Sequence, residues 1–153
     1  TVGMWINSFH GTKIHFVIVL SGKRKIMQRV VGLGGPFIKA NDPKALAAWY
    51  EKHLGLNFNG SVFTTLPFKN EDGSAREGYN ILSFFKADSD YFSPSRKEVM
   101  VNFIVADAFA LMATLKEEGV EMVGEPVDEE YGKFFWIMDP EGNKIELWEP
   151  PVG

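Results

Sequence analysis

The sequence predicts an α+β fold made of two βαβββ modules. The first observation is an internal repeat, because residues 37–50 and residues 102–115 follow the same pattern. In each copy an apolar run ends at an aspartate, and apolar residues then recur every three or four positions, as in a strand, a helix cap and an amphipathic helix. The second observation is that further strand-like runs, bounded by turn residues, follow each predicted helix.

In the first module, the opening strand ends at Asp42, which is a good helix cap, and Pro43 suits the first helical position. Gly55 is the expected left-handed stop. Two strands are expected next, at residues 61–66 and 79–85, joined by a polar and turn-rich loop. One face of the helix is marked by Leu46, Trp49, Tyr50 and Leu54.

In the second module, Asp107 repeats the cap and Gly119 repeats the stop. Strand-like runs are expected near residues 120–123, at 134–138 and at 144–148. The Asp-Pro-Glu-Gly-Asn segment between the last two is a tight turn, since proline presets one backbone angle and glycine supplies a positive φ. The helix stripe is Leu111, Met112 and Leu115.

Alternation of side chains along a strand assigns two faces to each strand. On one face of the strands of the second module we expect Val101, Phe103, Val105, Ile145 and Leu147. On the other we expect Met100, Asn102, Ile104, Lys144, Glu146 and Trp148. The purely apolar face should pack under a helix, and the mixed face should line solvent or a cleft.

The composition excludes several classes of protein. The net charge of −4, with scattered Lys and Arg, argues against a nucleic-acid partner, which needs a basic stripe. The absence of cysteine excludes disulfides, thiolate metal sites and cysteine nucleophiles. Near the start, the longest apolar run, residues 16–20, is too short to span a bilayer, and a basic cluster follows it in the wrong order for a secretory signal. We therefore expect no membrane association and a cytoplasmic location.

Residues 1–32 stand outside the repeat and are expected to form an N-terminal extension. Thr1 is not an initiator residue, so we expect something to precede the chain in the gene. Two interpretations stay open for the extension. In the first, residues 14–20, which favour β structure, form an extra strand on a sheet edge. In the second, the extension is artefactual and the natural start is Met27.

The paired modules, residues 37–56 with Asp-Pro and Ala-Trp-Tyr, and the closing run Tyr-Gly…Asp-Pro-Glu-Gly-Asn-Lys-Ile-Glu-Leu-Trp resemble the vicinal oxygen chelate superfamily. This group contains glyoxalase I, extradiol dioxygenases and the bleomycin-resistance proteins. The resemblance covers residues 33–149, with modules at 33–86 and 99–149. It implies that each module curls into a cupped mixed sheet, that the two modules enclose a cleft, and that chains pair as homodimers to cover open edges.

The resemblance also implies where a metal would bind. Metal-dependent members place one ligand on the first and one on the last strand of each module, and these slots fall on Gly35, Leu82, Met100 and Glu146. Only Glu146 carries a ligating group, whereas catalytic metal sites need about three protein ligands. We therefore expect no metal and no cofactor.

Glu146 is the candidate catalytic residue, as a carboxylate in the cleft that acts as an acid or base or holds a ligand's cation. The alternative is an ordinary strand carboxylate paired with Lys144, Lys39 or water. Asn102 either orients a ligand or bridges strands through water. The aromatic residues of the cleft either form a box for a flat apolar ligand or are simply core. The candidate ligand-binding residues are Phe37, Lys39, Leu82, Phe84, Met100, Asn102, Trp136 and Trp148.

These expectations favour metal-independent binding of a small apolar or aromatic compound in the cleft. The alternative is a lyase, isomerase or dioxygenase of the same superfamily that uses Glu146. A purely structural module is the third possibility, and it requires a cleft filled with side chains.

Overall fold

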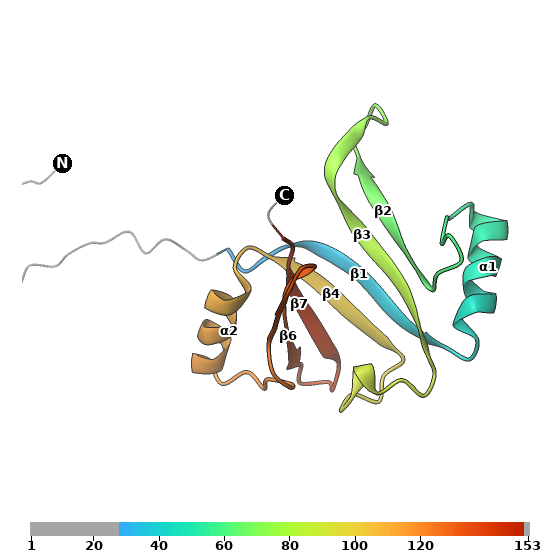
Figure 1. Cartoon of the computed structure of the whole chain (residues 1–153). Helices are drawn as coiled ribbons and strands as arrows, with labels where there is room; N and C mark the ends of the chain where they lie inside the picture. The colour runs from blue at the N-terminus through green and yellow to red at the C-terminus, as the bar shows by residue number, and fades with distance from the viewer. Residues whose placement is uncertain (1–27, 152–153) are drawn as a thin grey trace, which may run out of the picture.

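The computed structural model describes residues 28–151, in which a single seven-stranded mixed sheet carries two α-helices (Figure 1). The predicted strand at residues 14–20 and the start at Met27 lie outside the described residues and stay predictions. The elements are β1 (Val30–Ala40), α1 (Pro43–Leu54), β2 (Phe63–Lys69), β3 (Ala75–Lys86), the 3-10 helix η1 (Asp90–Phe92), β4 (Val99–Val105), α2 (Ala108–Glu117), β5 (Val127–Glu129), β6 (Gly132–Met138) and β7 (Lys144–Glu149).

The strands are ordered β2-β3-β1-β4-β7-β6-β5. In each module the first strand pairs in parallel with the last, β1 with β3 and β4 with β7. The two modules join where β1 and β4 pair antiparallel in the middle of the sheet. The sheet does not close, so β2 and β5 are its edges. This arrangement, with α1 and α2 at opposite ends of the sheet, confirms the predicted α+β fold (Figure 1).

The modules differ in one strand. The second has three strands after its helix, β5, β6 and β7, whereas the first has only β2 and β3. The segment between α1 and β2 is held as a loop, because the Thr64 hydroxyl donates to the Asn57 carbonyl at 2.6 Å and the Phe58 N–H donates to the Glu51 carboxylate at 2.8 Å. Phe58, in this loop, is buried beside Ala47 of α1.

Both helices begin as the sequence predicts. The Asp42 side chain accepts a hydrogen bond from the Ala45 N–H at 2.9 Å, and the Asp107 side chain accepts from the Ala110 N–H at 3.0 Å. Each bond satisfies a backbone donor that the first turn of a helix leaves unpaired. Gly55 follows α1 in the left-handed conformation, with φ 69°.

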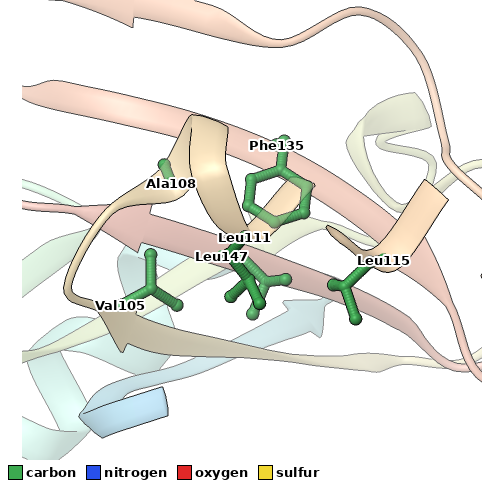
Figure 2. Close-up of a cluster of buried hydrophobic side chains, with 6 residues drawn as sticks. All are labelled: Val105, Ala108, Leu111, Leu115, Phe135 and Leu147. Atoms are coloured by element: carbon green, nitrogen blue, oxygen red, sulfur yellow. The ribbon is translucent and has the colours of Figure 1, made fainter. Parts of the chain in front are cut away.

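Two apolar clusters lie between the helices and the sheet. The α2 cluster combines residues of the helix with alternate residues of β4, β6 and β7, as predicted for the apolar face (Figure 2). Its buried members are Val105, Ala108, Leu111, Leu115, Phe135 and Leu147. The α1 cluster has Ala47, Phe58, Leu82 and Phe84 as its buried members.

The α1 cluster corrects two predictions, because Leu82 and Phe84 lie under the helix and not on the opposite face of the sheet. The strand register explains the error. Glu146 pairs with Asn102, and in the first module Ser83 pairs with Phe37, so Ser83 and not Leu82 is the counterpart of Glu146. The slot expected at Leu82 was therefore wrong by one residue, and a shift of one residue moves a strand's side chains to the other face.

Among the described residues no helix is long and apolar enough to cross a membrane.

Candidate functional site

The sheet face opposite the helices carries a buried carboxylate at the centre of the second module. Glu146 on β7 is 2% exposed. Its neighbours in the sheet are Asn102 on β4, in a parallel pair, and Trp136 on β6, in an antiparallel pair. Because paired residues on adjacent strands place their side chains on the same face, the sheet itself brings these three polar groups together.

Three donors satisfy the Glu146 carboxylate. The Asn102 side-chain amide donates to Oε1 at 2.6 Å, and the Trp136 indole N–H donates to Oε2 at 2.7 Å. The Tyr91 hydroxyl donates to Oε2 as well. An ionised carboxylate is a pure acceptor, so three donors from neutral groups suit the charged form and offset much of the cost of burying it.

Tyr91 reaches this face from the segment between the modules. The 3-10 helix η1 turns back over the sheet, and its Phe92 is fully buried against Phe37 and Met100. The Tyr91 ring stacks on Phe85, with ring centroids 5.1 Å apart and planes 10° apart, and meets Trp136 edge to face at 6.1 Å. Burial and the nearby Glu146 charge raise the pKa of Tyr91 far above its ordinary value, so its hydroxyl stays a donor.

The sequence interpretation missed Tyr91, because this residue lies between the two modules assigned to residues 33–86 and 99–149. The one available signal was the Tyr-Phe pair in an otherwise polar segment. Two adjacent aromatic residues in a linker usually need a surface to pack on.

Lys144 lies beside the carboxylate without an ion pair to it within 4.0 Å in the described part of the chain. Its ammonium donates instead to the Tyr91 carbonyl at 2.6 Å. It also lies 5.3 Å from the ring centroids of Tyr91 and of Trp136, which is within cation–π range. Burial lowers the pKa of Lys144, and the negative charges of Glu146 and Asp90 partly oppose this.

A hollow of about 520 Å³ opens in front of these groups. Tyr91, Trp136 and Lys144 form part of its lining, together with Ser93 and Glu125. Glu146 does not line the hollow but is bonded to two residues that do. The site therefore combines aromatic walls, an ammonium group and a buried carboxylate behind them.

The other predicted binding residues on this face are placed differently. Phe37 and Met100 are buried beneath Phe92, and the Lys39 ammonium lies 5.1 Å from the Phe92 ring centroid. Trp148 stacks on Phe134 with planes 6° apart and is largely buried. Of the predicted aromatic box, the structure brings only Trp136 to the hollow, and side chains of η1 fill the space over Phe37.

Asn102 has one unpaired atom. Its Nδ2 donates a hydrogen bond to Glu146, but its Oδ1 is buried without a hydrogen-bond partner among the described residues. This oxygen lies where a side chain on Gly34 would have to be, so the glycine leaves the room that the amide occupies. The amide thus positions the carboxylate, and β1 encloses the amide.

The residues at this site do not fit a divalent metal. Both oxygens of Glu146 accept hydrogen bonds from N–H or O–H donors, and the Lys144 ammonium lies close by. The other family slots hold Gly35, Leu82 and Met100, or Ser83 by the observed register. In residues 28–151 no three His, Asp or Glu side chains are grouped to hold a metal ion. A divalent cation needs several such ligands.

Known proteins resemble this chain in fold more than in sequence. No curated protein matches the sequence. Among solved structures, methylmalonyl-CoA epimerase from Mycobacterium tuberculosis is similar over 82% of this chain and 91% of its own, with a TM-score of 0.57 and 19% identity. A variant of the Streptomyces coelicolor methylmalonyl-CoA epimerase in complex with 2-nitronate-propionyl-CoA gives a TM-score of 0.54 and 19% identity, over 82% of this chain and 99% of its own.

A glyoxalase/bleomycin resistance protein/dioxygenase superfamily member from Vibrio splendidus 12B01 gives a TM-score of 0.50 and 15% identity, over 74% of this chain and 95% of its own. At these identities the likeness shows the fold alone. The sequence model of one protein family, the Glyoxalase/Bleomycin resistance protein/Dioxygenase superfamily, matches residues 32–147 of this chain. This match confirms the resemblance read from the repeat and the closing strands, and the chain belongs to that superfamily.

Proposed function

We propose that this protein binds a small, flat, largely apolar or aromatic compound, without a metal, in the hollow beside Glu146. The observation that carries the proposal is the Glu146 carboxylate, which is buried and held by three donors directly behind the aromatic wall of Tyr91 and Trp136. Small-molecule sites typically span about 300–1,000 Å³ and combine apolar walls with a few polar groups. The hollow, at about 520 Å³, has this size and this make-up.

The charges at the site limit the ligand's chemistry. The Lys144 ammonium is close to both aromatic rings of the wall, so it favours an electron-rich ring over a cation. One structural neighbour carries 2-nitronate-propionyl-CoA, which supports a small organic ligand for a protein of this fold. For the present chain, the aromatic wall favours a ring as the bound group.

A lyase, isomerase or dioxygenase reaction through Glu146 is the alternative. A general base must reach the proton that it removes, within about 3 Å or through one water. Glu146 is nearly inaccessible, and its oxygens already accept from Asn102, Tyr91 and Trp136. We therefore propose a positioning role for Glu146 and favour binding over catalysis.

A thermal-shift screen of aromatic metabolites and antibiotics tests the proposal. A ligand should stabilise the native state by about 2.7 kcal/mol at a concentration one hundred times its dissociation constant. The shift should persist after treatment with EDTA, because the proposed site uses no metal. It should be lost in Trp136→Ala, which removes a wall of the hollow. Loss of the shift on chelation would contradict metal-independent binding, and turnover of a bound compound would favour the enzyme.

A homodimer, in the cytoplasm, belongs to the same proposal. The edge strand β2 is unpaired on one side and exposes Phe63 and Leu66. Open strand edges with apolar side chains are usually covered, often by a second chain. Light scattering at micromolar concentration should give the mass of two chains, and the mass of one chain would refute pairing.

A further inference from the structure

Tyr91 is held as a bound ligand would be held. Its ring stacks on Phe85 and meets Trp136 edge to face, and its hydroxyl donates to Glu146. The Lys144 ammonium lies over the same ring. Every part of a phenol, its face, its edge and its hydroxyl, therefore has a dedicated partner at this site.

The residue that makes these contacts does not belong to the sheet that builds the site. Tyr91 lies in η1, a single turn between β3 and β4, whereas its partners Glu146, Trp136 and Phe85 lie on β7, β6 and β3. Its backbone is tied to the site by one side chain, since the Lys144 ammonium donates to its carbonyl. Phe92, next in the chain, is fully buried against Phe37 and Met100, and the Tyr91 ring packs against the same cluster. The contacts of Phe92 with Phe37 and Met100 would hold the turn on the sheet if the Tyr91 side chain moved away.

We infer that the pocket against Glu146 is a phenol-binding site, that Tyr91 occupies it in the free protein, and that the ligand is a planar phenol that competes with Tyr91. This inference rests on the proposed function and names the class of ligand. The hollow in front of Tyr91 is then the entrance, and displacement of the Tyr91 side chain joins it to the space beside the carboxylate.

The donors around Glu146 explain why a phenol fits better than other aromatic compounds. A ligand carboxylate would face the Glu146 charge and be repelled. A ligand ammonium group would meet the Lys144 ammonium, which lies over the Tyr91 ring. An aromatic ring without a hydroxyl would leave Glu146 one donor short, and a missing partner at a buried charged group weakens binding strongly. A neutral hydroxyl on a flat ring satisfies all three conditions.

The test uses Tyr91→Ala and two probes, p-cresol, which reproduces the tyrosine side chain, and toluene, which lacks the hydroxyl. Calorimetry should show p-cresol binding to Tyr91→Ala at least about tenfold more tightly than to the wild type, because the internal competitor is gone. It should also bind that variant at least about tenfold more tightly than toluene does. Tyr91→Phe is the matched control, since its ring still fills the site but lacks the hydroxyl that donates to Glu146, and its affinity for p-cresol should fall between those of the wild type and Tyr91→Ala.

Equal affinity of p-cresol for the wild type and Tyr91→Ala would show that Tyr91 does not compete with the ligand, and it would overturn the inference. Equal affinity of toluene and p-cresol for Tyr91→Ala would show a merely apolar cavity and overturn the phenol site. If Tyr91→Ala does not fold alone, p-cresol at millimolar concentration should restore its folding and toluene should not, and failure of both probes would overturn the inference.

The same measurements separate this inference from the proposed function. A wild type that responds to no aromatic compound, beside a Tyr91→Ala variant that binds p-cresol, would remove the proposed function and leave the phenol site. A wild type that binds flat compounds without hydroxyls, with no gain in Tyr91→Ala, would leave the proposed function and remove the phenol site.

Discussion

Gly35→Ala is expected to destabilise the protein more than a substitution at any glycine with open space around it. Gly35 lies in β1 with φ +142°, a conformation that side chains disfavour. A Cβ there would overlap the Ile81 carbonyl of β3 and lie 2.9 Å from the Ile81 nitrogen. Both atoms belong to the backbone of a neighbouring strand, so β1 and β3 would have to separate.

Backbone strain of this kind costs of order 1–3 kcal/mol, and overpacking costs typically about 1–3 kcal/mol more. The sum, about 2–6 kcal/mol, is comparable with the whole stability of many domains. Urea denaturation would measure it. Gly119→Ala is the matched control, because Gly119 also has a positive φ but no atom lies within 4 Å of its would-be Cβ. That variant should lose roughly 1–2 kcal/mol from strain alone, and an equal loss in the two variants would contradict the close approach.

The role of Gly35 shows why the sequence predicted the fold better than the site. By counting from the helix cap, the resemblance assigned this position to a metal slot, and glycine appeared only as a missing ligand. In the structure β1 has an irregularity between Leu33 and Gly35, where the pairing with β4 shifts. A bulge changes which residues share a face, and the glycines at positions 32, 34 and 35 are the sequence feature that marks it.

Most of the second module was predicted well because its signals are local, but the strand expected near residues 120–123 was wrong: Met122 forms only a single bridge there, and the strand β5 lies at Val127–Glu129. The cap at Asp107, the helix stripe and the alternation in β7 each follow from neighbouring residues, and they placed Glu146 and Asn102 on one face correctly. In the first module the slot on the last strand was carried over from Glu146 of the second module and fell on Leu82, whereas the register places Ser83 there. An error of one residue there is enough to assign every side chain of the strand to the wrong face of the sheet.

Tyr91 marks the limit of the sequence interpretation for a different reason. Its contacts to Glu146, Trp136 and Lys144 join residues far apart in the chain, and only the folded sheet brings them together. Asn102 is the instructive contrast. An amide in an apolar strand was expected to need partners, and the structure supplies one of them in Glu146.

Glu146→Leu is expected to be the most damaging change on the face opposite the helices. The variant places an apolar side chain of similar size where the carboxylate was, and it leaves Asn102, Trp136 and Tyr91 without their acceptor. A buried donor left without its acceptor typically costs about 1–3 kcal/mol, and this substitution leaves three such donors. Glu146→Gln should lose less, because its carbonyl oxygen still accepts while its amide nitrogen faces a donor.

Urea denaturation of Glu146→Leu, Glu146→Gln and a control, Glu117→Leu, would check this order. Glu117 lies at the exposed end of α2, where a substitution is usually within about 0.5 kcal/mol of neutral. The sign of the effect also decides between the two functions. Catalytic groups are often held at the expense of stability, so their removal tends to stabilise a protein. A more stable Glu146→Leu would favour the enzyme, whereas a large loss follows directly from a carboxylate that holds Asn102, Trp136 and Tyr91 in place.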